Sequence, residues 1–407
     1  MTSVLVSHPH AAAVANATAL ALERHGELGQ YVTGVVAGQT TLLGRVLHFL
    51  SPLGPVWRNR VLDIHQDSVR SLFPVELGAR LVASVAEAVG LDNPSLYDSI
   101  FVAHDAAVAR LPWSNEITAV YAYEDAALRT FQHASARAVG RAWDLPIPHY
   151  RTVEKMWHDE HRRWSGVAVG GPLIAPEWKK RRKDEEMSLA NVIFVASQHT
   201  RRSLEDADVR APVVVLPYGF PVFDFAPKDT NNEGPFTVLS VGIQGMGKGT
   251  HYLLQAWKKA AIKDARLRLV GPMRLSQSFL DGYAGLFEHV SYLPKPKLGD
   301  EYRAADVLAF PTLGDGFGLV IQESMCCGTP VITTPTSGGP ECITDGVDGW
   351  LVPPGDVDAL VERLRHCAAN RDRLCEMGRQ ARARAEQWTW REAGDALVLA
   401  LNRELGR

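Results

Sequence analysis

The sequence predicts an α/β protein with two doubly wound parallel sheets, one in each half of the chain. Short apolar runs rich in β-branched residues alternate with helical patterns in both halves. A stretch crowded with Pro, Gly and Asn separates the halves between Pro217 and Pro235. The length of 407 residues is sufficient for two or three domains. Two facing domains of this kind enclose a deep cleft, which is a common place for a small-molecule site.

We expect the N-terminal domain to span residues 1–220. A helical stretch that ends near Arg24 follows the first apolar run, and residues 40–95 have mainly helical patterns. The strands expected in this half are Ser3–Ser7, Tyr31–Val36, Ser99–Val102, Ile117–Tyr121, Val192–Ala196 and Val213–Leu216.

The second half alternates more regularly, and we expect a linker at residues 221–235 followed by a domain at 236–387. Helical patterns such as His251–Ala261 and Val320–Cys326 lie between its apolar runs. The strands expected there are Thr237–Gly242, Leu267–Gly271, Val290–Leu293, Asp306–Phe310 and Thr329–Thr333. In such sheets ligands bind at the carboxyl ends of the strands, near the point where the strand order reverses.

The composition excludes several classes of protein. Hydrophobic residues make up 46% and charged residues 22%, which is typical of a folded globular chain. The net charge of −3 predicts no nucleic-acid partner. No apolar run approaches the length that a membrane span requires. The five cysteines lie in the last quarter without a Cys-x-x-Cys pair, so we expect reduced thiols and a cytoplasmic location.

The segment Gly314–Glu323 is the most informative part of the chain. Gly316 and Gly318 allow a close backbone approach to a ligand, and the helix that follows offers unpaired N–H groups, which suits a phosphate. Asp315 and Glu323 lie eight residues apart, so they reach different ends of one long ligand. Carboxylates accept hydrogen bonds from sugar and ribose hydroxyls. From these residues alone, a glycine-rich turn with a capping acid is the alternative.

A second glycine-rich loop, Val241–Gly249, follows a strand and precedes a helix. Gly242, Gly247 and Lys248 match the P-loop pattern of nucleotide hydrolases, but Gly249 replaces the hydroxyl residue that holds magnesium. Lys248 is thus either a phosphate ligand or a solvated loop lysine.

The first of these segments resembles the acid–seven residues–acid signature of retaining glycosyltransferases with the GT-B fold, particularly family 4 (glycosyl transferases group 1). The resemblance continues through Gly328–Val331, Gly338–Glu341 and Asp345–Asp356. It implies the transfer of a sugar from a nucleotide-diphosphate sugar to a hydroxyl acceptor, which is a glycan, a lipid-linked molecule or a small molecule. No cofactor and no metal are expected. A non-catalytic sugar-nucleotide-binding protein and a sugar-nucleotide epimerase on the same fold are the alternatives.

The resemblance also assigns roles to single residues. Lys248 and Asp315 are the expected catalytic residues, Lys248 beside the leaving diphosphate and Asp315 on the sugar hydroxyls. Glu323 is expected to bind the ribose. The donor site further includes Gly242 and the amides of Gly316, Phe317, Gly318 and Leu319.

One position departs from the family pattern. Ile243 stands where the family has an Arg that binds the donor diphosphate, and Arg274 is one candidate for a replacement cation. Residues 388–407 resemble the family's final helix, which crosses back onto the first domain.

The acceptor side carries weaker signals. His8 and His10 follow the first strand, and His104 follows the run at 99–102. Tyr123 stands where family members often have a His, and Glu124 comes next. We expect these five residues near the acceptor; the alternatives are a surface His, a strand end and a helix-capping acid.

The basic run Lys179–Lys183 follows Trp178 and precedes three acids. It allows the i,i+4 pairs of a self-neutralised, solvated helix. The second interpretation is a dock for anionic lipid headgroups, which would place the protein peripherally at the inner face of the membrane.

Overall fold

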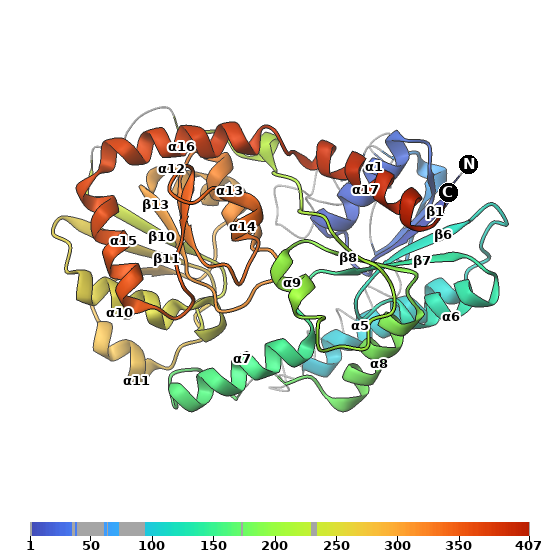
Figure 1. Ribbon diagram of the computed structural model, residues 1–407, viewed down its shortest axis with the longest axis horizontal. Helices are drawn as coiled ribbons and strands as arrows, with labels where there is room; N and C mark the ends of the chain where they lie inside the picture. Colours follow the sequence, from blue (N-terminus) through green and yellow to red (C-terminus); the bar gives the residue numbers. More distant parts are fainter. Residues whose placement is uncertain are drawn as a thin grey trace.

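The computed structural model describes residues 2–34, 37–38, 61–62, 64–72, 94–171, 174–228 and 234–406. Within these ranges the chain forms two α/β domains that lie side by side (Figure 1). Each domain is built on a parallel sheet with helices on both faces, as the alternating pattern predicts.

The N-terminal sheet has seven strands in the order β5-β2-β1-β6-β7-β8-β9. Its strands are β1 (Val4–Ser7), β2 (Leu28–Thr33), β5 (Val69–Ser71), β6 (Ala119–Tyr123), β7 (Gly140–Leu145), β8 (Val192–Val195) and β9 (Val213–Val215). A separate pair consists of β3 (Ala37–Gly38) and β4 (Val61–Leu62).

Both faces of this sheet are covered because its strands are apolar at successive positions. Val4 and Val6 of β1 face α1 and α17, whereas Leu5 between them faces α5, α6 and α8. The described helices of the N-terminal domain are α1 (Ala13–Arg24), α5 (Pro94–Arg110), α6 (Leu128–Ala136), α7 (Tyr150–Arg163), α8 (Glu177–Leu189) and α9 (Gln198–Arg202), with the short turn η2 (Gln66–Ser68). The turn η3 (Val222–Asp224) follows this domain, and its Val222 packs in the C-terminal core.

The C-terminal sheet has six strands in the order β12-β11-β10-β13-β14-β15. They are β10 (Phe236–Val241), β11 (Ala265–Val270), β12 (Glu288–Val290), β13 (Val307–Phe310), β14 (Val331–Thr333) and β15 (Gly349–Leu351). Helices α10 (Thr250–Ala260) and α15 (Val357–Ala369) cover one face; α12 (Lys295–Ala304), α13 (Leu319–Cys326) and α16 (Arg371–Ala385) cover the other. The remaining elements are η4 (Met246–Lys248), α11 (Gln277–Leu280), η5 (Asp281–Tyr283), α14 (Gly339–Cys342) and α17 (Trp390–Glu404).

The strand order reverses direction once in each sheet. The reversal lies between β1 and β6 in the first sheet and between β10 and β13 in the second. In open α/β sheets the crevice for a ligand forms outside the carboxyl ends of the strands at this point. The topology therefore marks one candidate site in each domain before any side chain is considered.

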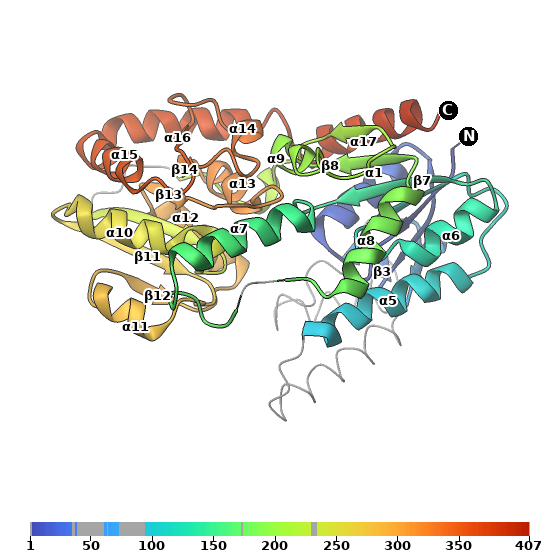
Figure 2. The same cartoon turned by 60° about the horizontal axis from the view of Figure 1, so that its bottom comes forward.

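Within the described residues, three connections join the two domains. The segment after β9 leads into β10, and α16 leads back into α17, which packs on α1 (Figure 1). The third crossing is α7, which runs from the N-terminal domain to the C-terminal one (Figure 2). Just beyond α7, Val167 is buried in the C-terminal core and Ala168 forms an antiparallel bridge with Leu275.

Several expectations need correction. The run Ser99–Val102 lies inside α5 and is not a strand, because its apolar residues belong to a longer helical period. The sequence did not predict strands β7 and β15, because β7 contains polar residues and β15 is only three residues long. Residues 40–95 were expected to be mainly helical. The described part of this stretch contains the strands β4 and β5 and the turn η2, and the rest of the expectation falls outside the described residues.

Helix α17 depends on a close approach to α1, and this contact can be tested at Gly394. A Cβ added at Gly394 would lie 2.6 Å from the Cβ of Ala21. We expect Gly394→Leu to destabilise the N-terminal domain by about 1–3 kcal/mol through overpacking. The measurement is the thermal unfolding midpoint. Leu399→Gln, at a 70% exposed position of the same helix, is the matched control and should leave the midpoint nearly unchanged.

Candidate active site

The two loops expected to bind the donor meet at the reversal point of the C-terminal sheet. The glycine-rich loop (Val241–Gly249) follows β10, and the acid loop (Gly314–Leu319) follows β13. Between them Lys248 donates a hydrogen bond to Asp315 within an ion pair. The Lys248 ammonium also lies 5.6 Å from the centre of the Phe310 ring. Both charged side chains are only partly buried, so a ligand can reach them.

A buried glutamine that the sequence analysis did not single out holds the glycine-rich loop in shape. The Gln244 side-chain amide donates to the carbonyls of Ser240, Gly242 and Val270. Its oxygen accepts a hydrogen bond from the Thr250 hydroxyl at 3.2 Å. In the sequence, the one hint of this structural role is that a polar residue, Gln244, lies inside a glycine-rich loop.

Gly249 argues against the nucleotide-hydrolase alternative. Its φ is +70°, a left-handed conformation that favours glycine. A Cβ at this position would lie 1.9 Å from the Pro311 carbonyl oxygen. The Ser or Thr of a P-loop therefore does not fit here without moving β13 or the loop.

The N-terminal domain contacts the acid loop directly. The Gly316 carbonyl accepts hydrogen bonds from the hydroxyls of Ser197 at 2.6 Å and Thr200 at 3.2 Å. A Cβ on Gly316 would lie 1.7 Å from the Pro146 carbonyl oxygen, so only glycine permits this contact. Gly318, with φ +85°, precedes the first residue of α13.

The remaining residues expected at the donor site differ in which of their groups a ligand could contact. Phe317 buries its ring edge-to-face against Tyr218, with centroids 5.2 Å apart, so its side chain belongs to the core. Leu319 is 37% exposed at the start of α13, where backbone N–H groups are unpaired. Glu323 lies one turn further along and accepts a hydrogen bond from the Tyr302 hydroxyl at 2.8 Å. Burial raises the pKa of Glu323.

On the acceptor side, three of the expected residues gather at the reversal point of the N-terminal sheet. His8 and His10 follow β1, and Tyr123 ends β6. The His8 ring lies 4.8 Å from the Tyr123 ring and 6.1 Å from the His10 ring, both measured between centroids. Burial lowers the pKa of His8 to about 4, so its imidazole is neutral at physiological pH.

The other two expected acceptor residues are buried and paired within the N-terminal domain. His104 lies on α5 rather than after a strand and forms a hydrogen bond with the Ser7 hydroxyl at 3.1 Å. Glu124 pairs with Lys183 of α8 at 2.6 Å, and both side chains are buried. Burial nevertheless raises the pKa of Glu124 to about 7. The surface-His and capping-acid alternatives are therefore wrong.

The basic run Lys179–Lys183 neither lies on a solvated face nor presents an open cationic patch. Of the three i,i+4 pairs expected, the structure contains Arg182–Glu186 at 3.1 Å. Arg181 is the one exposed cation of the run. The other four cations pair with carboxylates as follows: Lys179 with Asp98 and Asp125, Lys180 with Glu154 and Glu177, Arg182 with Asp105 and Glu186, and Lys183 with Glu124 and Asp125. These four cations are therefore balanced by carboxylates of the same domain.

In the described ranges no helix is both long enough and apolar enough to cross a membrane.

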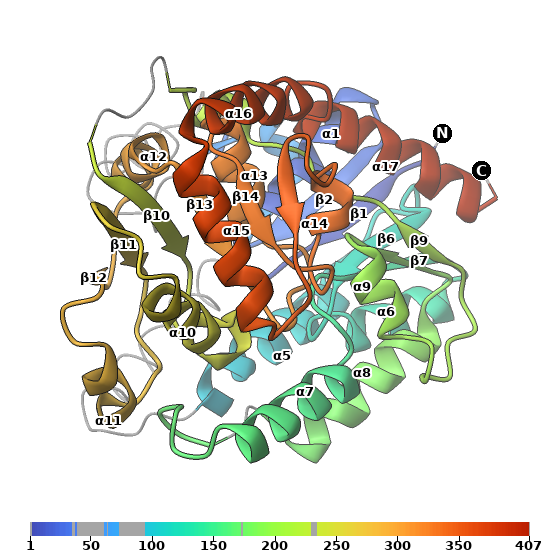
Figure 3. The ribbon, with the colours of Figure 1, turned by 60° about the vertical axis from the view of Figure 1, so that its left-hand side comes forward.

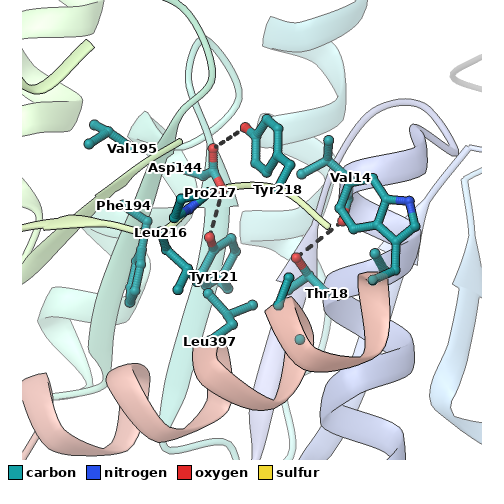
Figure 4. A pocket seen from close by; sticks show the side chains of 14 residues that line it. Val14, Thr18, Tyr121, Asp144, Phe194, Val195, Leu216, Pro217, Tyr218 and Leu397 are labelled. Atoms are coloured by element: carbon teal, nitrogen blue, oxygen red, sulfur yellow. Dashed lines mark hydrogen bonds between the residues drawn. The ribbon is translucent and has the colours of Figure 1, made fainter. Parts of the chain in front are cut away.

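A buried carboxylate lies where the domains are joined. Asp144 accepts hydrogen bonds from Tyr121 at 2.6 Å and from Tyr218 at 3.3 Å in a pocket lined by α1, α17 and the segment after β9 (Figure 4). Tyr218 also contacts Phe317 of the acid loop, and its carbonyl accepts a hydrogen bond from Gln322. Burial raises the pKa of Asp144 to about 7. Tyr218 thus links the domain crossing to the acid loop.

Comparison with known proteins shows what the C-terminal domain is similar to. Residues 235–370 match the family described as Glycosyl transferases group 1. D-inositol 3-phosphate glycosyltransferases from Gordonia bronchialis and Mycobacterium bovis are each 36% identical to the chain, over 124 and 129 residues. The matched stretch is 30% of this chain, and it covers 27% and 26% of those two relatives.

The likeness to solved structures extends over both domains. Sucrose-phosphate synthase from Thermosynechococcus elongatus has a TM-score of 0.65 and 18% identity, with 100% of this chain and 99% of that chain covered. Anabaena HepE in complex with UDP has a TM-score of 0.63 and 15% identity, with 99% and 100% covered. The whole chain therefore has the GT-B fold, with two facing Rossmann-like domains.

The position of Asp144 predicts a pH-dependent stability. Between pH 4 and 7 the folded protein keeps the Asp144 proton, which the unfolded chain releases, so the contribution of this group to stability falls as pH rises through that window. We expect Asp144→Asn to match the wild-type thermal midpoint near pH 5 and to exceed it near pH 8. Glu116→Gln, at an exposed position, should follow the wild type at both values. A variant midpoint below the wild type at pH 8 would contradict this account.

Proposed function

We propose that the protein is a retaining glycosyltransferase that moves a sugar from a nucleotide-diphosphate sugar to a hydroxyl acceptor. One observation carries the proposal: Lys248 and Asp315, from two separate loops, meet at the reversal point of the C-terminal sheet, beside the N-terminus of α13. Solved structures of HepE with UDP and with UDP-glucose support a donor of this class.

The proposed donor lies along the carboxyl edge of the C-terminal sheet. Glu323 binds the ribose hydroxyls, and Asp315 accepts hydrogen bonds from the sugar hydroxyls. The backbone N–H groups at the start of α13 and the Lys248 ammonium face the diphosphate. With the donor bound, Lys248 exchanges part of its contact with Asp315 for a phosphate oxygen, and Asp315 gains the sugar hydroxyls in return.

In the proposed reaction the bond between the anomeric carbon and the diphosphate oxygen breaks as the acceptor oxygen attacks from the same face. The acceptor proton passes to the departing diphosphate, so the anomeric configuration is retained. Negative charge grows on the diphosphate, and the preorganised Lys248 and the positive end of α13 stabilise it. These groups act without a metal ion, and we propose a metal-independent enzyme.

The acceptor is proposed to enter from the N-terminal domain, opposite the donor. His8, His10 and Tyr123 lie at the corresponding edge of that sheet. A neutral His8 serves as a hydrogen-bonding group for a hydroxyl and does not supply a proton at physiological pH. The proposed acceptor needs only a hydroxyl group, which a glycan, a lipid-linked molecule or a small molecule can provide.

The decisive experiment combines binding and turnover. A panel of nucleotide sugars is screened by thermal shift, since a ligand that binds only the folded protein raises its melting temperature. Donors that bind are then incubated with hydroxyl acceptors, with and without excess EDTA, and the anomer of the product is determined by NMR. Retained configuration and activity in EDTA are expected.

Other outcomes identify the alternatives. Donor binding without hydrolysis or transfer indicates a non-catalytic binding protein. A changed sugar in the absence of acceptor indicates an epimerase. Activity that EDTA abolishes and magnesium or manganese restores refutes metal independence.

Lys248 provides the first prediction for this function. We expect Lys248→Ala to lower turnover by roughly 10²–10³, the scale for loss of one preorganised charged donor. Lys263→Ala is the control, because Lys263 is an exposed lysine of the same domain. A folded Lys248→Ala enzyme with near-normal turnover would show that another group carries the diphosphate.

Glu323 provides the second prediction for this function. We expect Glu323→Ala to weaken the donor and the free nucleotide alike, by ~1.5–3 kcal/mol, because both contain the ribose. Calorimetric affinities for both ligands are the measurement. Tyr302→Phe is the matched control, since it removes only the hydroxyl that bonds to Glu323. Unchanged nucleotide affinity in folded Glu323→Ala would refute the ribose assignment.

A further inference from the structure

The proposed donor site lacks one cation on the glycine-rich loop. Ile243 is 52% exposed there, and its apolar side chain offers nothing to a phosphate. A diphosphate carries more negative charge than Lys248 alone neutralises. If the proposed function holds, the structure should contain a second cation within reach of this loop.

The segment that follows β11 runs alongside the glycine-rich loop. Gln244 N–H donates to the Pro272 carbonyl at 2.8 Å, and Arg274 N–H donates to the Gln244 carbonyl at 2.8 Å. These bonds extend the parallel pairing of β10 and β11 beyond the ends of both strands. Arg274 therefore has a fixed backbone position beside the loop that carries Lys248.

The side chains of Arg274 and Ile243 both lie near Gly245 of that loop. A Cβ added at Gly245 would lie 3.3 Å from the Arg274 Cβ and 4.0 Å from the Ile243 Cγ2. The Arg274 and Ile243 side chains therefore both lie close to Gly245, which has no side chain of its own. Arg274 is exposed, and in the part of the chain that the structure describes its guanidinium forms no ion pair.

The N-terminal domain holds the other edge of the Arg274 segment. Val169 N–H donates to the Arg274 carbonyl at 2.9 Å, and Ser276 N–H donates to the Val167 carbonyl at 2.7 Å. Between these bonds lies the antiparallel bridge of Ala168 with Leu275. The backbone around Arg274 is thus hydrogen-bonded on both sides, as in the middle of a sheet.

Residues 167–169 are anchored by the end of α7 that reaches the C-terminal domain (Figures 2 and 3). Glu160 of α7 is buried and forms hydrogen bonds with His251 at 3.2 Å and Tyr252 at 3.0 Å. The Trp164 indole N–H also donates to the Tyr252 hydroxyl at 3.0 Å. Trp157 packs on the glycine-rich loop, 3.3 Å from where a Gly247 Cβ would lie.

We propose that Arg274 is the second cation of the donor site, that it binds the diphosphate in place of an Arg at position 243, and that residues 167–169 position it. The guanidinium is suited to this task because it presents several N–H donors to phosphate oxygens in a fixed plane. Because the positioning segment comes from the N-terminal domain, the donor site is complete only when α7 is docked. This inference rests on the proposed function.

The test measures binding of nucleoside diphosphates and monophosphates by calorimetry, with the uracil, guanine and adenine series as probes. For the base that binds, we expect Arg274→Ala to weaken the diphosphate on the order of tenfold or more, and the monophosphate by less. Adding Ile243→Arg to Arg274→Ala should restore most of the diphosphate affinity. Arg379→Ala, at an exposed position of α16, is the control and should bind like the wild type.

Three results would overturn the assignment. In the first, Arg274→Ala binds the diphosphate as well as the wild type does; this refutes the role of Arg274 and leaves the proposed function intact. In the second, Arg274→Ala loses affinity for diphosphate and monophosphate equally, its melting temperature falls, and adding Ile243→Arg does not restore binding; this indicates a structural role for Arg274. If the wild type binds none of the diphosphates, the proposed function fails and this inference fails with it.

Discussion

The candidate site depends on a close approach between the backbones of two loops. Gly249 lies against the Pro311 carbonyl with no room for a Cβ. The Gly247 carbonyl accepts hydrogen bonds from the Leu313 N–H at 3.0 Å and from the Thr312 hydroxyl at 3.1 Å. Because the loops are held together in this way, Lys248 and Asp315 form an ion pair although they follow different strands. The reversal of strand order between β10 and β13 makes the approach possible.

The C-terminal domain does not build this site alone. The N-terminal domain fixes the acid loop through two hydroxyls on the Gly316 carbonyl, and it covers the glycine-rich loop with α7. Tyr218 connects the domain crossing at Asp144 with the ring of Phe317. A change in the angle between the domains would therefore move the two loops of the candidate site directly, because hydrogen bonds and packed side chains join these loops to the N-terminal domain.

Two carboxyls with strongly raised pKa values lie outside the candidate site. Burial raises the pKa of Asp144 to about 7 and that of Glu186 to about 8, and both carboxyls support the N-terminal domain. Glu186 accepts hydrogen bonds from the backbone of Ala127 and Leu128 and pairs with Arg182. The basic run on α8 balances such acids, and its members Arg182 and Lys183 are buried although the run resembles a surface patch in the sequence.

The sequence by itself determined the two-sheet α/β class and the two glycine-rich loops of the candidate site, because apolar periodicity and glycine spacing are local properties. It did not reveal β7, the helical state of Ser99–Val102, or the burial of His104 and Glu124, since these depend on neighbours distant in the chain. Only the tertiary structure decided that Lys248 meets Asp315 and that Arg274 lies beside Ile243. Such contacts arise from the strand order and from the third crossing by α7, and no spacing along the chain encodes a distance between separate loops.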